Sequence, residues 1–483
     1  MQQISPQDAQ FLYMESPNNL THATLVSLFD PTTAPQGKVT FDDIAAHIKS
    51  RQDTSALFTR RLHHVPLELD YPYWVDDEHF DIDNHLRRSQ LAAPGDWQQF
   101  CLEISRYHSS ALDMRRPPWE MNIIEGLDKI DGLPANSYAI ATKIHHVAVD
   151  GASVIKFLAA LQDSDALGTR VVEPSAETRS THKAPGVGDM IKRALSNNLV
   201  APIRVTDVLL CSAPLIRRAA RETLGAIASG KSTVPETRFS GTVSPNKTVD
   251  ATSFSLNDFK SISKLVDKAK INDVVLAVCS GGLRRYLQHH NDLPDDSLIA
   301  WVPINRRPGA SQVSTGEDPG NNLSAMTTPI HTNISDPLRR LRAIVRSTAD
   351  SKEARSGTSV RLMADITRNV ASPTQLAAAK LAVKTKFGSA CNVFISNVPG
   401  DQEQRYMNGA RIAGNLAIAP LSDGMGLFIG VLSYNGRISF TITSSRELLP
   451  DSERLVECLR AAYTELMFLA DPEHSEKEKG QWL

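Results

Sequence analysis

The chain has 483 residues, of which 41% are hydrophobic and 22% are charged, and its formal net charge is −2. This length and hydrophobic content suffice for a large core and for two domains of ordinary size. The balanced net charge gives no overall basic field of the kind that is typical of nucleic-acid-binding proteins. The five cysteines are scattered and form no C-x-x-C pair, so the sequence predicts a reduced, cytosolic protein without a metal site.

The N-terminal residues predict a helix and no targeting segment. The first ten residues, MQQISPQDAQ, lack both a basic region and an apolar core, so no secretory signal is expected. No apolar stretch of about 18 residues follows that could span a bilayer. Ser5-Pro6-Gln7-Asp8 is typical of a helix start. Glu15, close to the end of this short helix, fits a solvated helix-end carboxylate.

The next part of the chain alternates strand-like and helix-like patterns, which predicts an α/β layer. The expected strands cover 23–29, 71–75, 80–82 and 121–124, and the expected helices cover 41–48 and 97–112. Pro117-Pro118-Trp119-Glu120 leads into the last of these strands. A buried proline–tryptophan turn, with Trp119 used in packing, is one interpretation of this motif.

The strongest chemical signal follows a strand predicted over 138–144. His145 and His146 end this strand, and Asp150 and Gly151 complete the pattern H-H-x-x-x-D-G before an amphipathic helix. Side chains alternate between the faces of a strand, so one histidine can face a cleft while the other faces packing. The unit is therefore a strand, a tight polar loop and a helix.

This unit suits general base catalysis. A neutral imidazole can take a proton from a hydroxyl group as that group attacks a carbonyl carbon. Asp150 could hold the loop, and Gly151 could allow a sharp turn or the close approach of a substrate. A histidine pair alone is more often structural, and the chain has two other pairs, at 63–64 and 289–290. Only the pair at 145–146 is followed by Asp-Gly at this spacing.

The middle of the chain changes character. Residues 163–188 are rich in Ser, Thr, Pro, Gly and charge, and predict a linker. Residues 190–227 combine an apolar side with an excess of basic residues, which fits either a helix on an anionic lipid surface or a packed helix with a solvated basic face. Residues 225–232 match the phosphate-loop pattern G-x-x-x-x-G-K-[ST]. They lack the strand before and the helix after that such a loop requires, so nucleotide hydrolysis is not predicted.

From residue 239 the chain again alternates helices and strands. The expected helices follow Ser255, begin at Asn272 and cover 338–386 in two pieces, and the expected strands cover 298–303, 323–330, 392–396, 427–434 and 437–443. Asn435-Gly436 predicts a tight hairpin between the last two strands. Asn397-Val398-Pro399-Gly400 is a turn by composition.

Asn272 and Asp273 have two interpretations. Both side chains can accept hydrogen bonds from the free N–H groups of a helix start, and such capping explains the pair fully. A side-chain amide could also donate a hydrogen bond to an oxyanion.

Nine blocks of the sequence resemble one family. They are ISPQDAQFLYMESPNNLTHATLVSLFD, RRLHHVPLELDYPYWVDD, LDMRRPPWEMNIIEGL, the H-H-x-x-x-D-G motif, INDVVLAVCSGGLRRYL, WVPINRRP, GNNLSAM, NVFISNVPGD and SDGMGLFIGVLSYNGRISFTITS. In this order, over nearly the whole chain, they look like the bacterial bifunctional wax ester synthase/diacylglycerol acyltransferases. Pro118 departs from the family, whose motif at this place is P-L-W.

The resemblance implies an α/β fold of two chloramphenicol-acetyltransferase-like halves. Each half is expected to be a mixed sheet flanked by helices, and a long helical linker is expected to join them, with the active site in a channel between the halves. The expected domains are an N-terminal half with the histidine motif over 1–165, a linker with basic amphipathic helices over 166–238, a C-terminal half over 239–470 and a charged tail over 471–483.

The resemblance also implies an O-acyltransferase. It would move a long-chain acyl group from acyl-CoA, a substrate rather than a cofactor, to a fatty alcohol or to diacylglycerol. His146 is expected to be the general base, while His145 and Asp150 orient the loop and Gly151 allows close approach. The motif residues Pro117, Trp119, Asn272, Asp273 and Glu15 complete the candidate site. The absence of a G-x-S-x-G motif agrees with direct transfer without a serine nucleophile.

The cysteines and the net charge predict a cytoplasmic protein with no metal and no nucleic-acid partner, and the basic segment 190–227, together with the lipid substrates that the resemblance implies, predicts a place at the surface of a membrane or lipid droplet. Two alternatives stay open: a condensation-type acyltransferase that uses carrier-bound acyl groups, and an inactive relative that only binds lipid surfaces.

Overall fold

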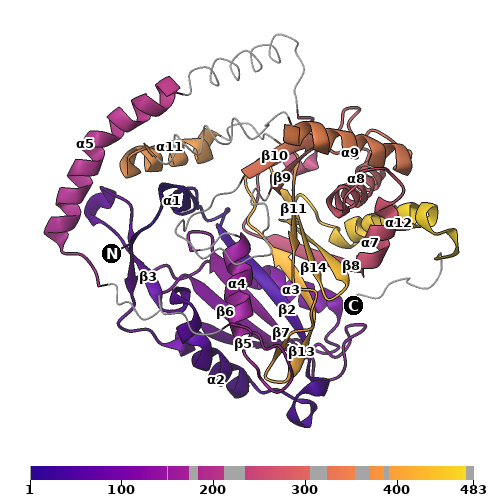
Figure 1. Cartoon of the computed structure of the whole chain (residues 1–483), viewed down its shortest axis with the longest axis horizontal. Coiled ribbons are helices and arrows are strands. Elements are labelled where there is room, and N and C mark those ends of the chain that lie inside the picture. The colour runs from indigo at the N-terminus through magenta and orange to yellow at the C-terminus, as the bar shows by residue number, and fades with distance from the viewer. Residues whose placement is uncertain are drawn as a thin grey trace.

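A computed structural model describes residues 2–148, 151–172, 183–211, 234–304, 324–353, 369–385 and 391–474. Figure 1 shows two sheet-rich halves side by side, the first built mainly from the earlier part of the chain and the second from the later part. The predicted mixed α/β class with two halves is confirmed. The proposed domain boundaries stay predictions.

The first half contains a six-stranded sheet in the order β12-β13-β2-β7-β6-β5. Its strands are β2 (His22–Asp30), β5 (Leu86–Gln90), β6 (Trp119–Glu125), β7 (Tyr138–His145), β12 (Tyr406–Met407) and β13 (Ala410–Ile418). Only β5 and β6 run parallel; the other neighbours are antiparallel. Every residue of β7 is buried.

Helices bury both faces of β7. On one face α2 (Phe41–Arg51) and α4 (Gly151–Leu161) pack through Ile48 and Phe157 against Ile140 and its neighbours. On the other face α3 (Trp97–Ser109) packs through Phe100. A strand covered on both faces is expected to be mainly apolar, and the sequence of β7 accordingly shows no regular alternation of polar and apolar residues, although it contains the buried Lys143.

The second half contains a six-stranded sheet in the order β10-β9-β11-β14-β15-β8. Its strands are β8 (Lys247–Ser255), β9 (Ile299–Ile304), β10 (Ser324–Pro329), β11 (Val393–Pro399), β14 (Leu427–Tyr434) and β15 (Arg437–Ser445). Its core also contains residues of α7 (Leu256–Ser263), α8 (Ile271–His289), α9 (Pro337–Glu353) and α12 (Ser452–Ala470). The predicted hairpin at Asn435-Gly436 is confirmed, with Tyr434 paired to Arg437.

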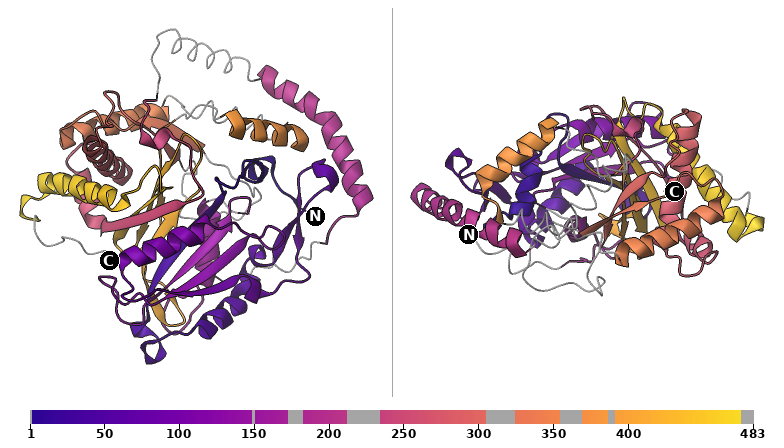
Figure 2. Two further views of the ribbon diagram at one scale, coloured as in Figure 1. Left: turned by 180° about the vertical axis from the view of Figure 1, so that it is seen from behind. Right: turned by 90° about the horizontal axis from the view of Figure 1, so that it is seen from above.

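A smaller sheet flanks the first half. It has the order β1-β4-β3, formed by β1 (Gln2–Gln3), β4 (Tyr73–Asp76) and β3 (Arg60–His63). The helices near it are α1 (Pro6–Tyr13), α5 (Val187–Cys211) and α11 (Ser372–Thr385). The predicted start of α1 is confirmed, because the Ser5 hydroxyl accepts a hydrogen bond from the Asp8 N–H. In both views of Figure 2, α5 lies at the edge of the molecule away from α12.

The two halves are joined by a shared strand pairing and by hydrogen bonds. The strand β13, which lies far along the chain, pairs with β2 in the first sheet, and the Ser27 hydroxyl donates to Asn415 Oδ1 at 2.7 Å. A second contact joins α3 of the first half to β8 of the second half, where Trp97 Nε1 donates to Asp250 Oδ1 at 2.9 Å. The helix α11 reaches back to α1, where Tyr13 Oη lies 2.6 Å from Ser372 Oγ. The halves are therefore bound by backbone pairing and buried polar contacts.

Several local predictions are wrong. Residues 80–82 form no strand, and a short 3₁₀ turn covers Ile82–Asn84 instead. Asn397-Val398-Pro399 is not a turn, because β11 continues to Pro399 in parallel pairing with β14. A proline is tolerated there because the described pairing of β11 with β9 covers only Val393 and Phe394, so at Pro399 the strand pairs on one side only. The Ser255 side chain makes no capping hydrogen bond, although it precedes α7.

Other predictions fall outside the described residues. These are the C-terminal part of the basic segment 190–227, the phosphate-loop match at 225–232, and the tail from residue 475.

Candidate active site

The histidine pair lies where β7 ends, and the neighbouring backbone holds it on both sides. The His145 N–H donates to the Pro118 carbonyl oxygen at 3.0 Å, and the His146 N–H donates to the Thr21 carbonyl oxygen at 3.0 Å. Pro118 precedes β6 and Thr21 precedes β2, the two strands that flank β7. The proline–tryptophan motif and the histidine motif therefore meet at one edge of the first sheet.

The His145 ring is fixed by hydrogen bonds at both nitrogens, and the residue is only 1% exposed. The Val147 N–H donates to Nδ1 at 3.0 Å, so Nδ1 is the acceptor and Nε2 carries the proton. Nε2 lies 3.0 Å from Thr21 Oγ1, whose own hydroxyl donates to the Phe11 carbonyl oxygen at 2.7 Å. Both nitrogens are thus committed inside the protein, which leaves neither for a substrate.

Glu15 completes the surroundings of His145. Its Oε2 lies 3.5 Å from His145 Nε2, and its Oε1 accepts a hydrogen bond from the Thr21 N–H at 3.2 Å. The side chain is 25% exposed. Glu15 is therefore not a freely solvated carboxylate, as one interpretation of the sequence had it, because the chain between α1 and β2 turns back onto β7.

His146 has different surroundings. Its residue is half-buried, and its ring stacks on the Phe11 ring of α1 with the centroids 4.9 Å apart and the planes 20° from parallel. The two histidines thus differ as strand alternation predicted, with one ring fixed in the interior and the other on an aromatic platform. Gly151 is the first residue of α4, and Asp150 lies outside the described residues.

Trp119 is a packing residue. It is 1% exposed, its Nε1 donates to the Phe58 carbonyl oxygen at 3.0 Å, and its ring stacks on His85 at 4.4 Å. Pro117 is also buried, and its carbonyl oxygen accepts a hydrogen bond from the Trp119 N–H at 2.8 Å. The motif acts on the site through its backbone, by way of the hydrogen bond from His145 to Pro118.

Asn272 and Asp273 lie in the first turn of α8, in the second half. Asp273 accepts from the Lys270 N–H at 2.8 Å, which confirms capping for this residue, and also from the Thr348 hydroxyl at 2.8 Å. Asn272 does not cap the helix; its Oδ1 accepts from Asn397 Nδ2 at 3.3 Å. Helix α8 begins one residue earlier than predicted, so Asn272 falls inside the helix. No hydrogen bond or ion pair of the described residues joins this pair to His145 or His146.

Buried basic groups that were not predicted from the sequence lie beside the histidine pair. Lys143 lies two residues before His145 and has a fully buried side chain that donates to the Ser110 carbonyl oxygen at 2.8 Å. Burial lowers the pKa of this ammonium group to about 8. His22 stands opposite His145 across β2 and β7, and burial lowers its pKa well below the usual range. The sequence feature that could have indicated these buried groups is Lys143, a lysine in the middle of a mainly apolar strand.

Two further buried groups extend this set toward the second half. Burial lowers the pKa of His108 on α3 to about 3. Lys247 of β8 donates to the Asn18 carbonyl oxygen at 2.8 Å, and burial lowers its pKa to about 8. Because β8 belongs to the second sheet and Asn18 precedes β2, this lysine lies at the junction of the halves.

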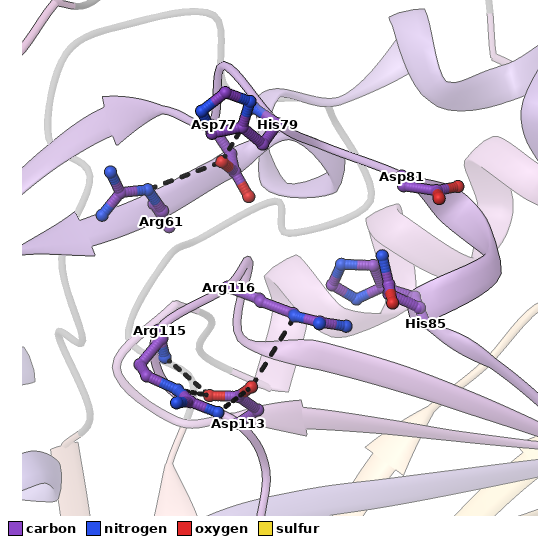
Figure 3. A pocket seen from close by; sticks show the side chains of 9 residues that line it. Arg61, Asp77, His79, Asp81, His85, Asp113, Arg115 and Arg116 are labelled. Atoms are coloured by element: carbon purple, nitrogen blue, oxygen red, sulfur yellow. Dashed lines mark hydrogen bonds and ion pairs between the residues drawn. The ribbon is translucent and has the colours of Figure 1, made fainter.

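A polar cavity of about 400 Å³ lies next to the proline–tryptophan motif, since its lining includes Arg116, which precedes the motif, and His85, on which the Trp119 ring stacks (Figure 3). Its arginines are paired with carboxylates: Arg61 with Asp77 at 3.6 Å, and Arg115 and Arg116 with Asp113 at 2.9 and 3.6 Å. Among the described residues, no group of three or more His, Cys, Asp or Glu side chains could hold a metal ion.

Comparison with known proteins identifies the chain. Residues 4–275 match the model of the wax ester synthase/diacylglycerol acyltransferase catalytic domain, and residues 319–467 match the C-terminal domain of the same proteins. The chain belongs to the wax ester synthase/diacylglycerol acyltransferase family. The histidine pair, Glu15 and Asp273 all lie within the region matched by the catalytic domain.

Comparison with individual proteins supports this family assignment. Two Mycobacterium tuberculosis proteins named as diacylglycerol O-acyltransferases are 31% and 30% identical to this chain, over 98% and 94% of its length and 91% and 94% of theirs. The structure of the wax ester synthase/diacylglycerol acyltransferase from Marinobacter aquaeolei VT8 matches with a TM-score of 0.67 and 25% identity, over 97% of this chain and 99% of that one. This chain is therefore an acyltransferase.

The fold extends beyond the wax ester synthase/diacylglycerol acyltransferase family. A trichothecene 15-O-acetyltransferase from Fusarium sporotrichioides matches with a TM-score of 0.57 at 13% identity, over 97% of this chain and 94% of that one. At this identity the likeness concerns the fold alone.

Proposed function

We propose that this acyltransferase moves a long-chain acyl group from acyl-CoA to the hydroxyl group of a fatty alcohol or of diacylglycerol, with His146 as the general base. The family membership supports the donor and the acceptors. The observation that carries the choice of base is the contrast between the two histidines. His145 has both ring nitrogens committed to Val147 and Thr21, so it holds the loop, whereas the ring of His146 is half-buried and stacks on Phe11. The motif contains no other histidine, so we assign the base to His146.

The reaction is a single transfer within a ternary complex. The His146 imidazole takes the proton of the acceptor hydroxyl as the oxygen attacks the thioester carbonyl carbon. The carbon–sulfur bond then breaks, and the coenzyme A thiolate takes the proton back from the imidazolium. A new ester and free coenzyme A leave, and no acyl-enzyme forms. Acyl-CoA is a substrate in this scheme, and we propose that no cofactor or metal takes part.

Thiol release from palmitoyl-CoA tests this function. It is measured with and without hexadecanol or dipalmitoylglycerol, in the wild type, in His146→Ala and in His289→Ala. The last variant is the control, because His289 is an exposed histidine from another His-His pair. We expect release that depends on the acceptor and that falls at least about 100-fold in His146→Ala only. Near-normal turnover of His146→Ala would overturn the assignment, and no release with either acceptor would point to carrier-bound donors.

We further propose that α5 brings the enzyme to the lipid surface that holds its acceptors. No described helix is long and apolar enough to cross a membrane. The side of α5 that carries Met190 and Ala194 is buried, whereas Leu195, Leu199 and Ile203 follow each other at four-residue spacing and are 55%, 75% and 63% exposed. An exposed apolar stripe on a helix is suited to insertion among lipid headgroups. The exposed stripe of α5 therefore supports the proposal that the protein associates peripherally with a membrane.

Liposome flotation tests this second proposal. The triple variant Leu195→Ser, Leu199→Ser, Ile203→Ser is compared with Phe468→Ser, which removes an exposed apolar side chain of α12, away from α5 (Figure 2). We expect the triple variant alone to lose binding to vesicles of anionic phospholipid. Equal flotation of both variants would contradict a role for α5.

A further inference from the structure

A second cavity lies in the other half of the molecule, between the loop that joins α7 to α8 and one side of α9. Its volume is about 860 Å³. Four basic side chains line it: Lys268, Lys270, Arg342 and Arg346. The first two come from the loop and the other two from α9, and all four residues are exposed. They therefore face each other across the cavity from two separate elements.

These four cations are not neutralised inside the described part of the chain. None of them forms an ion pair with a described carboxylate, although Asp267, Asp273 and Asp350 also line the cavity. Asp273 is committed elsewhere, since its two oxygens accept from the Lys270 N–H and from the Thr348 hydroxyl. The cavity of Figure 3 is the opposite case, because each of its arginines is held by an aspartate. Of the two cavities, only the second has basic groups available for an anionic ligand.

The same cavity offers an apolar surface. Leu265, Val266 and Val345 line it, and all three are partly buried against the core of the second half. A ligand that matches both features has a flat apolar part and several negative charges. The adenosine phosphates of coenzyme A have these properties, and the volume falls in the range of about 300–1,000 Å³ that small-ligand sites occupy.

We propose that this cavity binds the phosphorylated adenosine end of the acyl-CoA donor. The inference rests on the proposed function, since it assumes that the donor is a coenzyme A thioester. The cations would bind the phosphate oxygens through charge-assisted hydrogen bonds, and the aliphatic side chains would cover the adenine face.

This assignment gives the Asn-Asp pair of α8 a role that the active site does not. Asp273 hydrogen bonds to both walls of the cavity, to the loop at Lys270 and to α9 at Thr348. It is thus a positioning residue that fixes the distance between the two pairs of cations. Asn272 joins the same turn to Asn397 of β11, the strand that lies between β9 and β14 in the second sheet.

The test compares two double variants that remove the same charge. Arg342→Gln with Arg346→Gln removes two cations from the proposed site, and Arg61→Gln with Arg116→Gln removes two paired cations from the cavity of Figure 3. Each is assayed with palmitoyl-CoA and with palmitoyl-N-acetylcysteamine, a donor without phosphates. Calorimetry with adenosine 3′,5′-bisphosphate measures binding without any turnover.

We expect the first double variant to raise KM for palmitoyl-CoA and Kd for the bisphosphate at least about tenfold, because a lost hydrogen bond to a charged group costs roughly that much. Its kcat and its KM for the phosphate-free donor should not change, and the control should keep wild-type values throughout. An unchanged Kd in the first variant, or an equal loss in the control, would overturn the proposal. If the wild type binds the bisphosphate but transfers no acyl group, the proposed function fails and the phosphate site stands.

Discussion

Thr21 holds both members of the histidine pair: its hydroxyl oxygen lies 3.0 Å from His145 Nε2, and its carbonyl oxygen accepts the His146 N–H at 3.0 Å. Thr21, which directly precedes β2, thus accepts the proton of one ring and positions the backbone of the other.

Replacing Thr21 by valine keeps the shape of the side chain and removes the acceptor of the His145 proton. We expect kcat to fall about tenfold or more, and the free energy of unfolding to fall by about 1–3 kcal/mol, the cost of a buried polar group without its partner. Thr24→Val is the matched control, since Thr24 of β2 also has a buried histidine partner: its Oγ1 lies 2.8 Å from Nδ1 of His108 on α3. The control should lose similar stability in denaturant titrations but keep its kcat, and an equal loss of kcat in both would refute the role of Thr21.

The Phe11 ring is expected to align His146. Replacing Phe11 by leucine keeps an apolar side chain but removes the stacked ring, an interaction worth about 0.5–1.5 kcal/mol. We predict a two- to tenfold decrease in kcat with KM for acyl-CoA unchanged, measured by steady-state thiol release. Phe80→Leu, which removes the ring 5.3 Å from His85, serves as the comparison and should leave kcat as it is. The prediction is wrong if Phe11→Leu turns over at the wild-type rate.

Because of Lys143, the free energy of unfolding should be higher in alkaline solution than near neutral pH. Burial lowers the pKa of its ammonium group to about 8 in the folded chain, against about 10.4 when unfolded. Between these values the unfolded chain binds more protons, so the free energy of unfolding rises with pH from about 8 to about 10.4. In Lys143→Met this rise should be shallower, whereas replacement of the exposed Lys49 by methionine should not alter it. Unfolding in urea at pH 8, 9 and 10 gives the slopes, and identical slopes would exclude a contribution from Lys143.

Gly430 allows the two sheets to approach each other. A Cβ atom at this position of β14 would lie 2.4 Å from the carbonyl oxygen of Ala417 on β13. Backbone cannot move aside as a flexible side chain can, so Gly430→Ala should lower the free energy of unfolding by about 1–3 kcal/mol. Gly188→Ala is the contrasting change, since nothing lies within 4 Å of its added Cβ and it belongs to α5. A thermal melt in which both variants match the wild type would argue against close contact between β13 and β14.

The sequence was most informative where structure depends on neighbours in the chain. The strand before His145, the helix after Gly151 and the hairpin at Asn435 were predicted, because periodicity and turn residues act over short distances. Asn397-Val398-Pro399 was predicted wrongly, since parallel pairing with β14 overrides a turn-like composition. Local sequence patterns thus predict where helices and strands lie in the chain, but they do not predict which strands pair with each other.

The surroundings of the histidine pair were harder to predict for the same reason. The contacts of Glu15 and Thr21 with His145 exist only because β2 pairs with β7 across more than a hundred residues. The strand β13 was not predicted at all, although its residues alternate between buried and less buried positions. No local signal says that it belongs beside β2. The general base was assigned from the motif and the family, and its role stays a prediction.

The pairing of β13 with β2 also bears on how the protein is made. A ribosome releases the N-terminal half long before residues 410–418 exist, so until then one edge of β2 has unpaired N–H and C=O groups. Non-local pairing of this kind folds slowly and leaves apolar surface open to aggregation. The nascent chain would therefore depend on chaperones for most of its synthesis, and expression of the N-terminal half alone would give insoluble protein even though it carries the whole histidine motif.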